Sequence, residues 1–284
     1  MGGGIAQVLA AKGHEVILSD VDEARVRKGI DGIAKRLDRD VEKGRMTAEM
    51  RGEILSHIDG RVHFRDLDVQ LAIEAATERL DLKLDLFRFL DKNTPPEAVL
   101  ASNTSSISIT VLGAVTSRPE NVVGMHFMNP VPVMKLVEVI RGIATSDATF
   151  GFVRDLAAGL DKTPVEVRDF PGFIANRILM PMINEAIYAL YEGVASVEAI
   201  DTVMKLGMNH PMGPLTLADF IGLDTCLAIM NVLYDGFGDS KYRPCPLLKQ
   251  YVAAGWLGKK SGRGFYDYSA AANGAAPSVA AAAR

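Results

Sequence analysis

Cysteine is scarce in this sequence of 284 residues, which contains only Cys226 and Cys245. Two cysteines cannot form a disulfide framework in a chain of this length, and they lack the C-x-x-C spacing of a structural zinc site. The scarcity therefore predicts a protein of a reducing compartment, with the cytoplasm as the expected location. We also predict no metal site.

An excess of basic charge is absent as well. The sequence has 31 Lys and Arg against 35 Asp and Glu, a formal net charge of −4, whereas binding a phosphate polymer requires a clear positive surplus. We therefore expect no nucleic-acid partner. The composition does not indicate disorder, because 48% of the residues are hydrophobic and 23% are charged, close to the average for globular proteins.

Long apolar runs are missing too. The longest uncharged stretch, residues 98–117, contains Asn103 and several Ser and Thr residues, which makes it a poor membrane span. The amino-terminal residues do not show a basic segment followed by an apolar one, the pattern of a signal peptide. We expect no membrane insertion.

Up to about residue 167, short apolar runs alternate with helical patterns. This order is typical of repeated β–α–β units and predicts an α/β domain with a doubly wound, mostly parallel sheet. The expected strands are 15–19, 71–74, 98–102, 122–126, 135–140 and 164–167, and the expected helices between them include 22–43 and 81–91.

From residue 169 the pattern changes to helices alone, expected over 172–191, 197–206, 215–234 and 246–254. We predict an α/β domain over 1–168, an all-α domain over 169–268 and a disordered tail over 269–284. The helix from residue 172 is apolar on much of its surface, and Pro181 is expected to kink it. Such a broad apolar face favours deep burial or contact with a second copy of the chain.

A glycine-rich turn, a helix, a strand and an acidic residue follow one another at the start of the chain. Gly2 opens the glycine-rich turn, and the strand that follows the helix leads to Asp20. A helix amino terminus can hold a pyrophosphate, and a carboxylate about 20 residues further on can bind the hydroxyls of a ribose. The pattern predicts a dinucleotide site that includes Gly2 and Asp20 and favours NAD over NADP. A plain turn residue is the alternative for Asp20.

The dinucleotide fingerprint G-x-G-x-x-G is incomplete, because only its third glycine has a match, at Gly2. The strand that should lead into the first glycine has no counterpart ahead of Met1. That strand is central in a doubly wound sheet, so we expect the two strands beside its position to have open edges.

A histidine and a glutamate lie on two neighbouring expected strands, at His126 and Glu138. Glu138 shares a strand face with apolar residues, where an ionised carboxylate is costly unless it is paired. His126 is the expected partner, and a histidine oriented by a carboxylate is a common general acid or base. The spacing is equally compatible with a structural histidine and an exposed edge glutamate.

The segment S-N-T-S-S at 102–106 follows an expected strand and leads into a helix. It places hydroxyl and amide groups at the carboxyl end of the sheet, where open α/β sheets bind ligands. Ser105 is a candidate to hold a substrate oxygen, although a helix cap is the more frequent role of such a cluster. Asn176 follows the crossing into the second domain, so it is either a residue of an interdomain cleft or part of a helix start.

Several segments together resemble the 3-hydroxyacyl-CoA dehydrogenase family. They are S-N-T-S-S at 102–106, H-F-M-N-P at 126–130, K-L-V-E-V at 135–139, P-G-F-I-A-N-R at 171–177 and G-M-N-H-P-M-G-P at 207–214. The similarity extends from residue 1 to about residue 268 and includes the closing G-K-K-S-G-R-G-F-Y at 258–266. It implies a Rossmann-like doubly wound sheet, here without its first strand, and an all-α domain that forms a homodimer.

The resemblance also implies a reaction, the NAD-dependent interconversion of short-chain (S)-3-hydroxyacyl-CoA and 3-oxoacyl-CoA. The expected pair is 3-hydroxybutyryl-CoA and acetoacetyl-CoA. By resemblance, His126 exchanges the proton of the 3-hydroxyl group, and Glu138 orients and charges that histidine. Ser105 and Asn176 match residues that hold the reacting oxygen and the thioester end of the acyl-CoA.

Further residues match the cofactor side of the family's site. Asp20 matches the ribose carboxylate, and the positions near the nicotinamide half are Glu78, Lys83, Ser105 and Asn129. Candidates for the phosphates of coenzyme A are basic residues of the first long helix, Lys43 together with Lys35, Arg36 and Arg39.

Two other hypotheses stay open. A non-catalytic relative would keep the fold as a dimeric structural or ligand-binding protein, although the four expected catalytic residues are all present. Dehydrogenases of 2-hydroxy or β-hydroxy acids share the fold plan but lack the H-F-x-N-P and L-V-E motifs found here. The sequence leaves the acyl chain length and the physiological direction undetermined.

Overall fold

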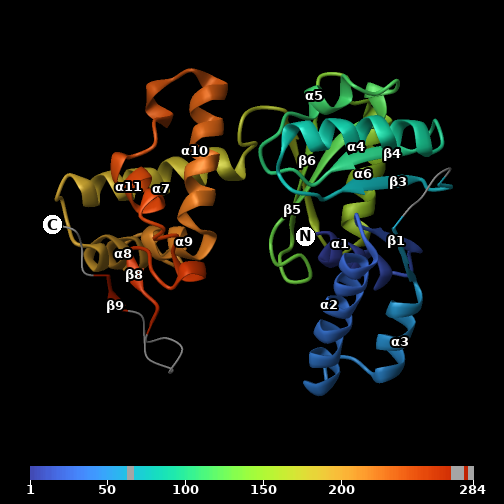
Figure 1. The fold of residues 1–284 in the computed structure, drawn as a ribbon, viewed down its shortest axis with the longest axis horizontal. Helices are drawn as coiled ribbons and strands as arrows, with labels where there is room; N and C mark the ends of the chain where they lie inside the picture. The colour runs from blue at the N-terminus through green and yellow to red at the C-terminus, as the bar shows by residue number, and fades with distance from the viewer. Residues whose placement is uncertain (63–66, 270–277, 281–284) are drawn as a thin grey trace. The chain divides into compact units, whose positions relative to one another are not determined.

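The computed structural model describes residues 1–62, 67–269 and 278–280. The chain divides into two compact units, Met1–Phe170 and Pro171–Arg284 (Figure 1). Most of the stretch 269–284, expected to be a disordered tail, lies outside the described residues.

The first unit alternates helices and strands, and the six strands expected from the sequence are present to within one residue at each end. Its elements are α1 (Gly2–Ala10), β1 (Val16–Ser19), α2 (Glu23–Glu42), α3 (Ala48–Ser56), β2 (Ile58–Arg61), β3 (Leu71–Glu74), α4 (Leu80–Asn93), β4 (Val99–Ser102), α5 (Ile109–Gly113), η1 (Pro119–Asn121), β5 (Val122–Phe127), β6 (Leu136–Arg141), α6 (Asp147–Gly159) and β7 (Thr163–Arg168).

The described strands of the first unit form two sheets. β3, β4, β5, β6 and β7 lie side by side in chain order, whereas β1 pairs with β2 in a separate parallel pair. Neighbours in the larger sheet are parallel except β5 and β6, which are antiparallel. β1 and β3 each lie at an edge of their sheet, as expected for the two strands with open edges, and the arrangement confirms the expected fold class.

Successive side chains of the larger sheet point to opposite faces. One face packs with α1 and α6 in a buried cluster that includes Val99, Ala101, Val123, Met125, Val137 and Val139. On the other face, Gly124 lies against Ile140 and against Ile109 of α5, and a Cβ at Gly124 would come within 2.7 Å of Ile140. His126 and Glu138 belong to this second face, since each is two residues from Gly124 or Ile140 along its strand.

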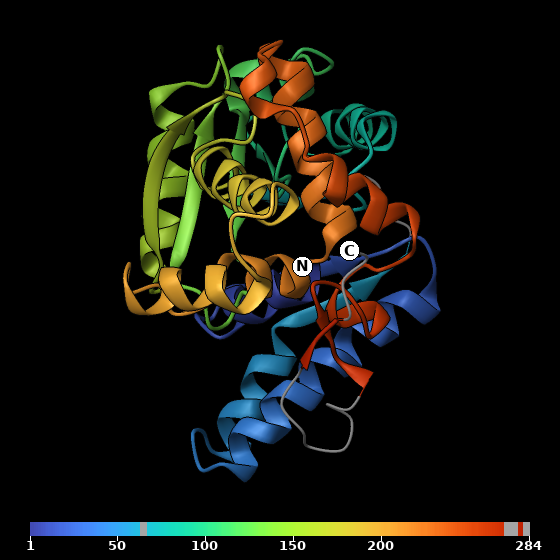
Figure 2. The same cartoon turned by 90° about the vertical axis from the view of Figure 1, so that its left-hand side faces the viewer.

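Short polar side chains begin several helices. Asp22 accepts a hydrogen bond from the Arg25 amide at the start of α2, and Thr47 and Ser146 cap α3 and α6 in the same way. Each satisfies an amide that has no partner within its helix. α2 and α3 contact each other and extend away from the larger sheet (Figures 1 and 2).

The second unit is mainly helical, as expected, with α7 (Ala175–Tyr191), α8 (Val197–Leu206), α9 (Pro214–Ile221), α10 (Leu223–Phe237), η2 (Ser240–Tyr242), α11 (Pro246–Ala253) and η3 (Lys259–Ser261). α7 continues through Pro181. The helix expected over 215–234 is two helices instead, because Gly222 has a φ of 102°, a conformation that other residues rarely adopt.

A short antiparallel pair joins β8 (Tyr266–Asp267) to β9 (Ser278–Val279). The sequence did not predict this pair. The amide of Ala280 also donates to the carbonyl of Phe265 at 3.1 Å. Residues 278–280, within the stretch expected to be a disordered tail, therefore lie against the segment that closes the helical unit.

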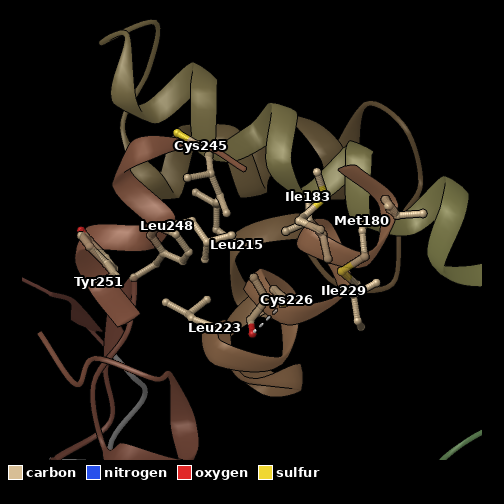
Figure 3. Close-up of a cluster of buried hydrophobic side chains, with 14 of the residues drawn as sticks. Met180, Ile183, Leu215, Leu223, Cys226, Ile229, Cys245, Leu248 and Tyr251 are labelled. Atoms are coloured by element: carbon tan, nitrogen blue, oxygen red, sulfur yellow. Dashed lines mark hydrogen bonds between the residues drawn. The ribbon is translucent and has the colours of Figure 1, made fainter. Parts of the chain in front are cut away.

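One hydrophobic cluster forms the core of the second unit (Figure 3). Its buried side chains include Met180, Ile183, Leu215, Leu223, Cys226, Ile229, Cys245, Leu248 and Tyr251. Both cysteines are free thiols and buried, and burial raises the pKa of the Cys226 thiol to about 12. A thiol of this kind acts as a small hydrophobic side chain rather than a nucleophile.

Among the described helices, none is long and apolar enough to cross a membrane by itself. α9 and α10 reach that length and composition only together, as a pair bent by 98°.

Candidate active site

β5 and β6 place a histidine directly opposite a glutamate. His126 and Glu138 are partners in the antiparallel register, and Nδ1 of His126 lies 2.8 Å from Oε2 of Glu138. Only 11% of the His126 side chain and 2% of the Glu138 side chain are exposed. The carboxylate fixes the orientation of the ring through Nδ1, so Nε2 is the nitrogen that can exchange a proton with a ligand.

Asn103 ties the histidine strand to its neighbours. Its side-chain Oδ1 accepts from the Phe127 amide at 2.9 Å, and its own amide donates to the carbonyl of Glu74 at 2.8 Å. The carboxyl ends of β3, β4 and β5 are therefore held at one edge of the sheet. Asn103 belongs to the S-N-T-S-S motif at 102–106, in which the pattern alone indicates no separate role for it.

The turn after β4 is built around the carboxylate of Glu78. Its Oε1 accepts from the Thr104 hydroxyl at 2.5 Å, the Ser105 amide at 3.0 Å and the Ser106 amide at 3.1 Å. The Ser105 hydroxyl lies 3.3 Å from the same oxygen. The structure thus brings together two expected site residues, Glu78 and Ser105.

Opposing effects act on the pKa of Glu78. Partial burial alone would raise it, but the hydrogen bond from Thr104, the charge of Lys83 and the bonds from Ser106 and Ser105 outweigh burial and lower it. Glu78 therefore stays ionised and acts as an acceptor for the turn. Its side chain is 37% exposed, so it also faces the solvent side of the site.

Lys83 is buried, with 1% of its side chain exposed. Its ammonium donates to the two oxygens of Glu74 at 2.7 and 2.8 Å and lies 3.4 Å from Oε2 of Glu78. The expected cofactor residue Lys83 is therefore connected to the edge of the site through Glu78. The sequence analysis did not predict Glu74 as a site residue. The pattern that could have indicated it is a carboxylate at the last position of an otherwise apolar strand.

The residues expected at a dinucleotide lie at strand and helix ends. Gly2 is the first residue of α1, and the capping residue Met1 makes no side-chain hydrogen bond to the helix. Asp20 directly follows β1, and its Oδ1 accepts from the Val21 amide at 2.8 Å. An uncapped helix amino terminus and a carboxylate after a strand suit the pyrophosphate and ribose of a dinucleotide, so these residues fit NAD.

Asn129 lies exposed in the loop between β5 and β6. This loop packs on α1, because a Cβ at Gly4 would come within 3.0 Å of Val131. The structure thus places Asn129 in a loop that contacts the helix expected to bind the pyrophosphate, just beyond the strand that carries His126.

Other candidates lie elsewhere. Lys43 is exposed at the carboxyl end of α2, in the turn that extends away from the larger sheet. Arg36 donates to Oε1 of Gln7 at 2.7 Å and to the carbonyl of Gly3 at 3.2 Å, so it joins α2 to α1. Asn176 belongs to the second unit, where it lies buried in the first turn of α7.

The described residues do not meet the requirements of a metal site. No group of three or more His, Cys, Asp and Glu side chains within the described ranges has a geometry that could hold a metal ion.

Family models match both units of the chain. The model described as "3-hydroxyacyl-CoA dehydrogenase, NAD binding domain" matches residues 1–170, and the one described as "3-hydroxyacyl-CoA dehydrogenase, C-terminal domain" matches residues 172–268.

Individual relatives are similar over nearly the whole chain. A probable 3-hydroxybutyryl-CoA dehydrogenase of Bacillus subtilis is 59% identical, covering 94% of both chains. A 3-hydroxybutyryl-CoA dehydrogenase of Bradyrhizobium diazoefficiens is 57% identical, covering 95% of this chain and 93% of the relative. The crystal structure of (S)-3-hydroxybutyryl-CoA dehydrogenase from Ralstonia eutropha is similar with a TM-score of 0.93 and 52% identity, covering 95% of both chains.

Proposed function

Because the chain belongs to the 3-hydroxyacyl-CoA dehydrogenase family, we propose that it interconverts short-chain (S)-3-hydroxyacyl-CoA and 3-oxoacyl-CoA with NAD. The proposed pair is 3-hydroxybutyryl-CoA and acetoacetyl-CoA, which is supported by the names of the similar bacterial enzymes. The observation that carries the proposal is the buried contact of 2.8 Å between His126 and Glu138.

The chemistry of a secondary alcohol explains why this contact matters. In the oxidation, the N–H group at Nδ1 of His126 donates a hydrogen bond to the Glu138 carboxylate and keeps its proton, so Nε2 presents a lone pair that removes the proton of the 3-hydroxyl group. In the reduction, doubly protonated His126 returns this proton from Nε2, and the adjacent carboxylate stabilises the positive ring. NAD, when bound, supplies the hydride acceptor or donor.

Further site residues are given supporting roles in this proposal. Ser105 holds the reacting oxygen, and Asn176 holds the thioester end of the acyl-CoA. Gly2 lies at the phosphates of NAD, Asp20 binds its ribose hydroxyls, and Glu78, Lys83 and Asn129 shape the nicotinamide end. Lys43 is proposed to bind the phosphates of coenzyme A.

The test of the function is the consumption of NADH by the purified chain with acetoacetyl-CoA as substrate, followed by absorbance. We expect turnover with NADH and much slower turnover with NADPH, because the Asp20 carboxylate repels a 2′-phosphate. Reactions without enzyme and with His126→Gln protein are the controls. A chain that binds NADH but never consumes it would support a non-catalytic relative instead.

We also propose a homodimer formed through the second unit. It is supported by large apolar side chains that are exposed on that unit, namely Ile178, Val203, Leu206, Met208 and Phe220. The proposed location is the cytoplasm, which agrees with the two free, buried thiols.

A further inference from the structure

Glu74, the last residue of β3, lies at the centre of a buried polar cluster. Its carboxylate accepts from the Lys83 ammonium at 2.7 and 2.8 Å, from the Ser102 hydroxyl at 2.7 Å and from the Ala76 amide at 2.6 Å. Only 5% of Glu74 is exposed. A buried carboxylate with this many donors is satisfied, and it fixes every group that donates to it.

The cluster joins three parts of the chain. Glu74 and Ser102 are opposite each other in the parallel register, as the last residues of β3 and β4. Lys83 comes from α4, the helix that follows β3. The amide of Thr104 also donates to the Ser102 hydroxyl at 3.1 Å. Glu74 therefore holds α4 and the carboxyl ends of β3 and β4 together, next to the turn that contains Ser105.

Lys83 stands between two carboxylates at unequal distances. It is within 2.8 Å of both oxygens of Glu74 but 3.4 Å from Oε2 of Glu78. Burying an ammonium is costly, so Lys83 requires a close anionic partner. Because Glu74 supplies that partner, Glu78 can direct its Oε1 to the turn at residues 104–106.

We propose that Glu74 is a positioning residue for the dehydrogenase reaction, holding Lys83 so that Glu78 keeps the turn with Ser105 in place. This rests on the proposed function only for its effect on turnover. Without the charge of Glu74, the nearest remaining anion for Lys83 is Glu78. The ammonium then moves toward Glu78 and draws its carboxylate away from the amides of Ser105 and Ser106.

The direct test is amide hydrogen exchange of Ser105 and Ser106 in the full chain carrying Glu74→Gln. Gln keeps the size of the side chain and removes its charge. We expect exchange of these two amides to be about tenfold to a hundredfold faster, the value of one charge-assisted hydrogen bond. We also expect kcat with acetoacetyl-CoA to fall by about tenfold or more, with a smaller change in the KM for NADH.

A matched control is available on α4, the helix that carries Lys83. Asp91 of α4 pairs with Arg118 at 3.1 Å, and their side chains are 12% and 6% exposed. Asp91→Asn therefore also removes a charge from a mostly buried ion pair. We expect it to lower the melting temperature while leaving kcat and the exchange of Ser105 and Ser106 unchanged.

The double variant Glu74→Gln with Lys83→Met separates positioning from general stability. It removes the ammonium that would otherwise attract Glu78, so the amides of Ser105 and Ser106 should regain much of their protection. The proposal would be overturned if the amides of Ser105 and Ser106 exchanged at the wild-type rate in Glu74→Gln. It would also be overturned if they exchanged faster in the double variant than in Glu74→Gln. Hydrogen exchange can be measured without turnover. A wild-type chain inactive on acetoacetyl-CoA would therefore refute the proposed function, while the exchange data would still test whether Glu74 positions the turn.

Discussion

At the scale of single residues, Glu138 determines what His126 can do. The glutamate lies on a sheet face beside Ile140, where a carboxylate is stable only with a close donor. His126 is that donor through Nδ1, at 2.8 Å. The same contact fixes the tautomer of the ring, because a proton on Nδ1 leaves the lone pair on Nε2. The stability of the buried carboxylate and the proposed acid–base chemistry therefore both depend on the hydrogen bond between His126 and Glu138.

Replacing His126 with Gln should abolish most of the turnover and leave NADH binding nearly intact. A positioned acid or base contributes about a hundredfold to ten-thousandfold to a rate, so kcat should fall within that range. NADH affinity should hold, because the residues proposed to bind the dinucleotide are other side chains, located in α1, in α4 and in the loops after β1, β3, β4 and β5. Steady-state kinetics and fluorescence titration with NADH measure the two quantities. A variant that kept most of its rate would remove His126 from the chemistry.

At the scale of elements, periodicity predicted the strands well and local conformation poorly. β5 and β6 are apolar enough to be found directly, but β2 has the sequence I-D-G-R, with one apolar residue and no alternation. Nothing in the apolar pattern at 215–234 marks a break, which depends on the φ of 102° at Gly222.

The site was likewise predictable only in part. His126 and Glu138 could be paired because they lie on neighbouring expected strands and Glu138 shares a strand face with apolar residues, where it requires a partner. The role of Glu74 could not be predicted, because a lysine on a charged helix such as α4 is normally solvated. Only the packing of α4 against β3 and β4 shows that Lys83 is buried and needs a carboxylate.

A second buried carboxylate fastens the closing segment of the chain to α9. Asp219 accepts from the amides of Phe265 and Tyr266 at 3.0 and 2.9 Å and from the Tyr268 hydroxyl at 3.1 Å. Burial raises the pKa of Asp219 to about 6, although these hydrogen bonds act in the opposite direction. The nearby charge of Asp201 adds to the increase.

This raised pKa predicts how stability changes with pH. A carboxyl group whose pKa is higher in the folded state stabilises the fold below its ordinary pKa, and this contribution is lost as the pH rises through about 6. Relative to Asp219→Asn, the wild-type chain should therefore lose about 1–3 kcal/mol of unfolding free energy between about pH 4 and pH 7. Denaturant unfolding of both proteins across this range measures the difference. Parallel curves would show that Asp219 does not titrate as described.

At the scale of the whole molecule, the two units contribute differently to the proposed enzyme. The first unit contains the His126–Glu138 pair, the turn around Glu78 and the residues that fit NAD. The second unit contains a core built from its helices and carries Asn176, for which we propose a contact with the thioester. Its surface keeps large apolar side chains exposed, including Leu206 at 81% and Ile178 at 68%. An exposed apolar set of this kind is expected to be covered by a partner, which is why we propose a second copy of the chain.

Substituting Leu206 with Asp should convert the proposed dimer into a monomer. A charge in the apolar centre of an interface is desolvated without a partner, which costs about 2–5 kcal/mol or more of association energy. Sedimentation equilibrium should show the mass of two chains for the wild type and of one chain for Leu206→Asp. Ile143→Asp is the matched control, because Ile143 is 89% exposed but belongs to the first unit, so this variant should remain dimeric. A wild-type chain that sediments as a monomer would exclude the dimer. A Leu206→Asp variant that stays dimeric would show that the dimer contact lies elsewhere.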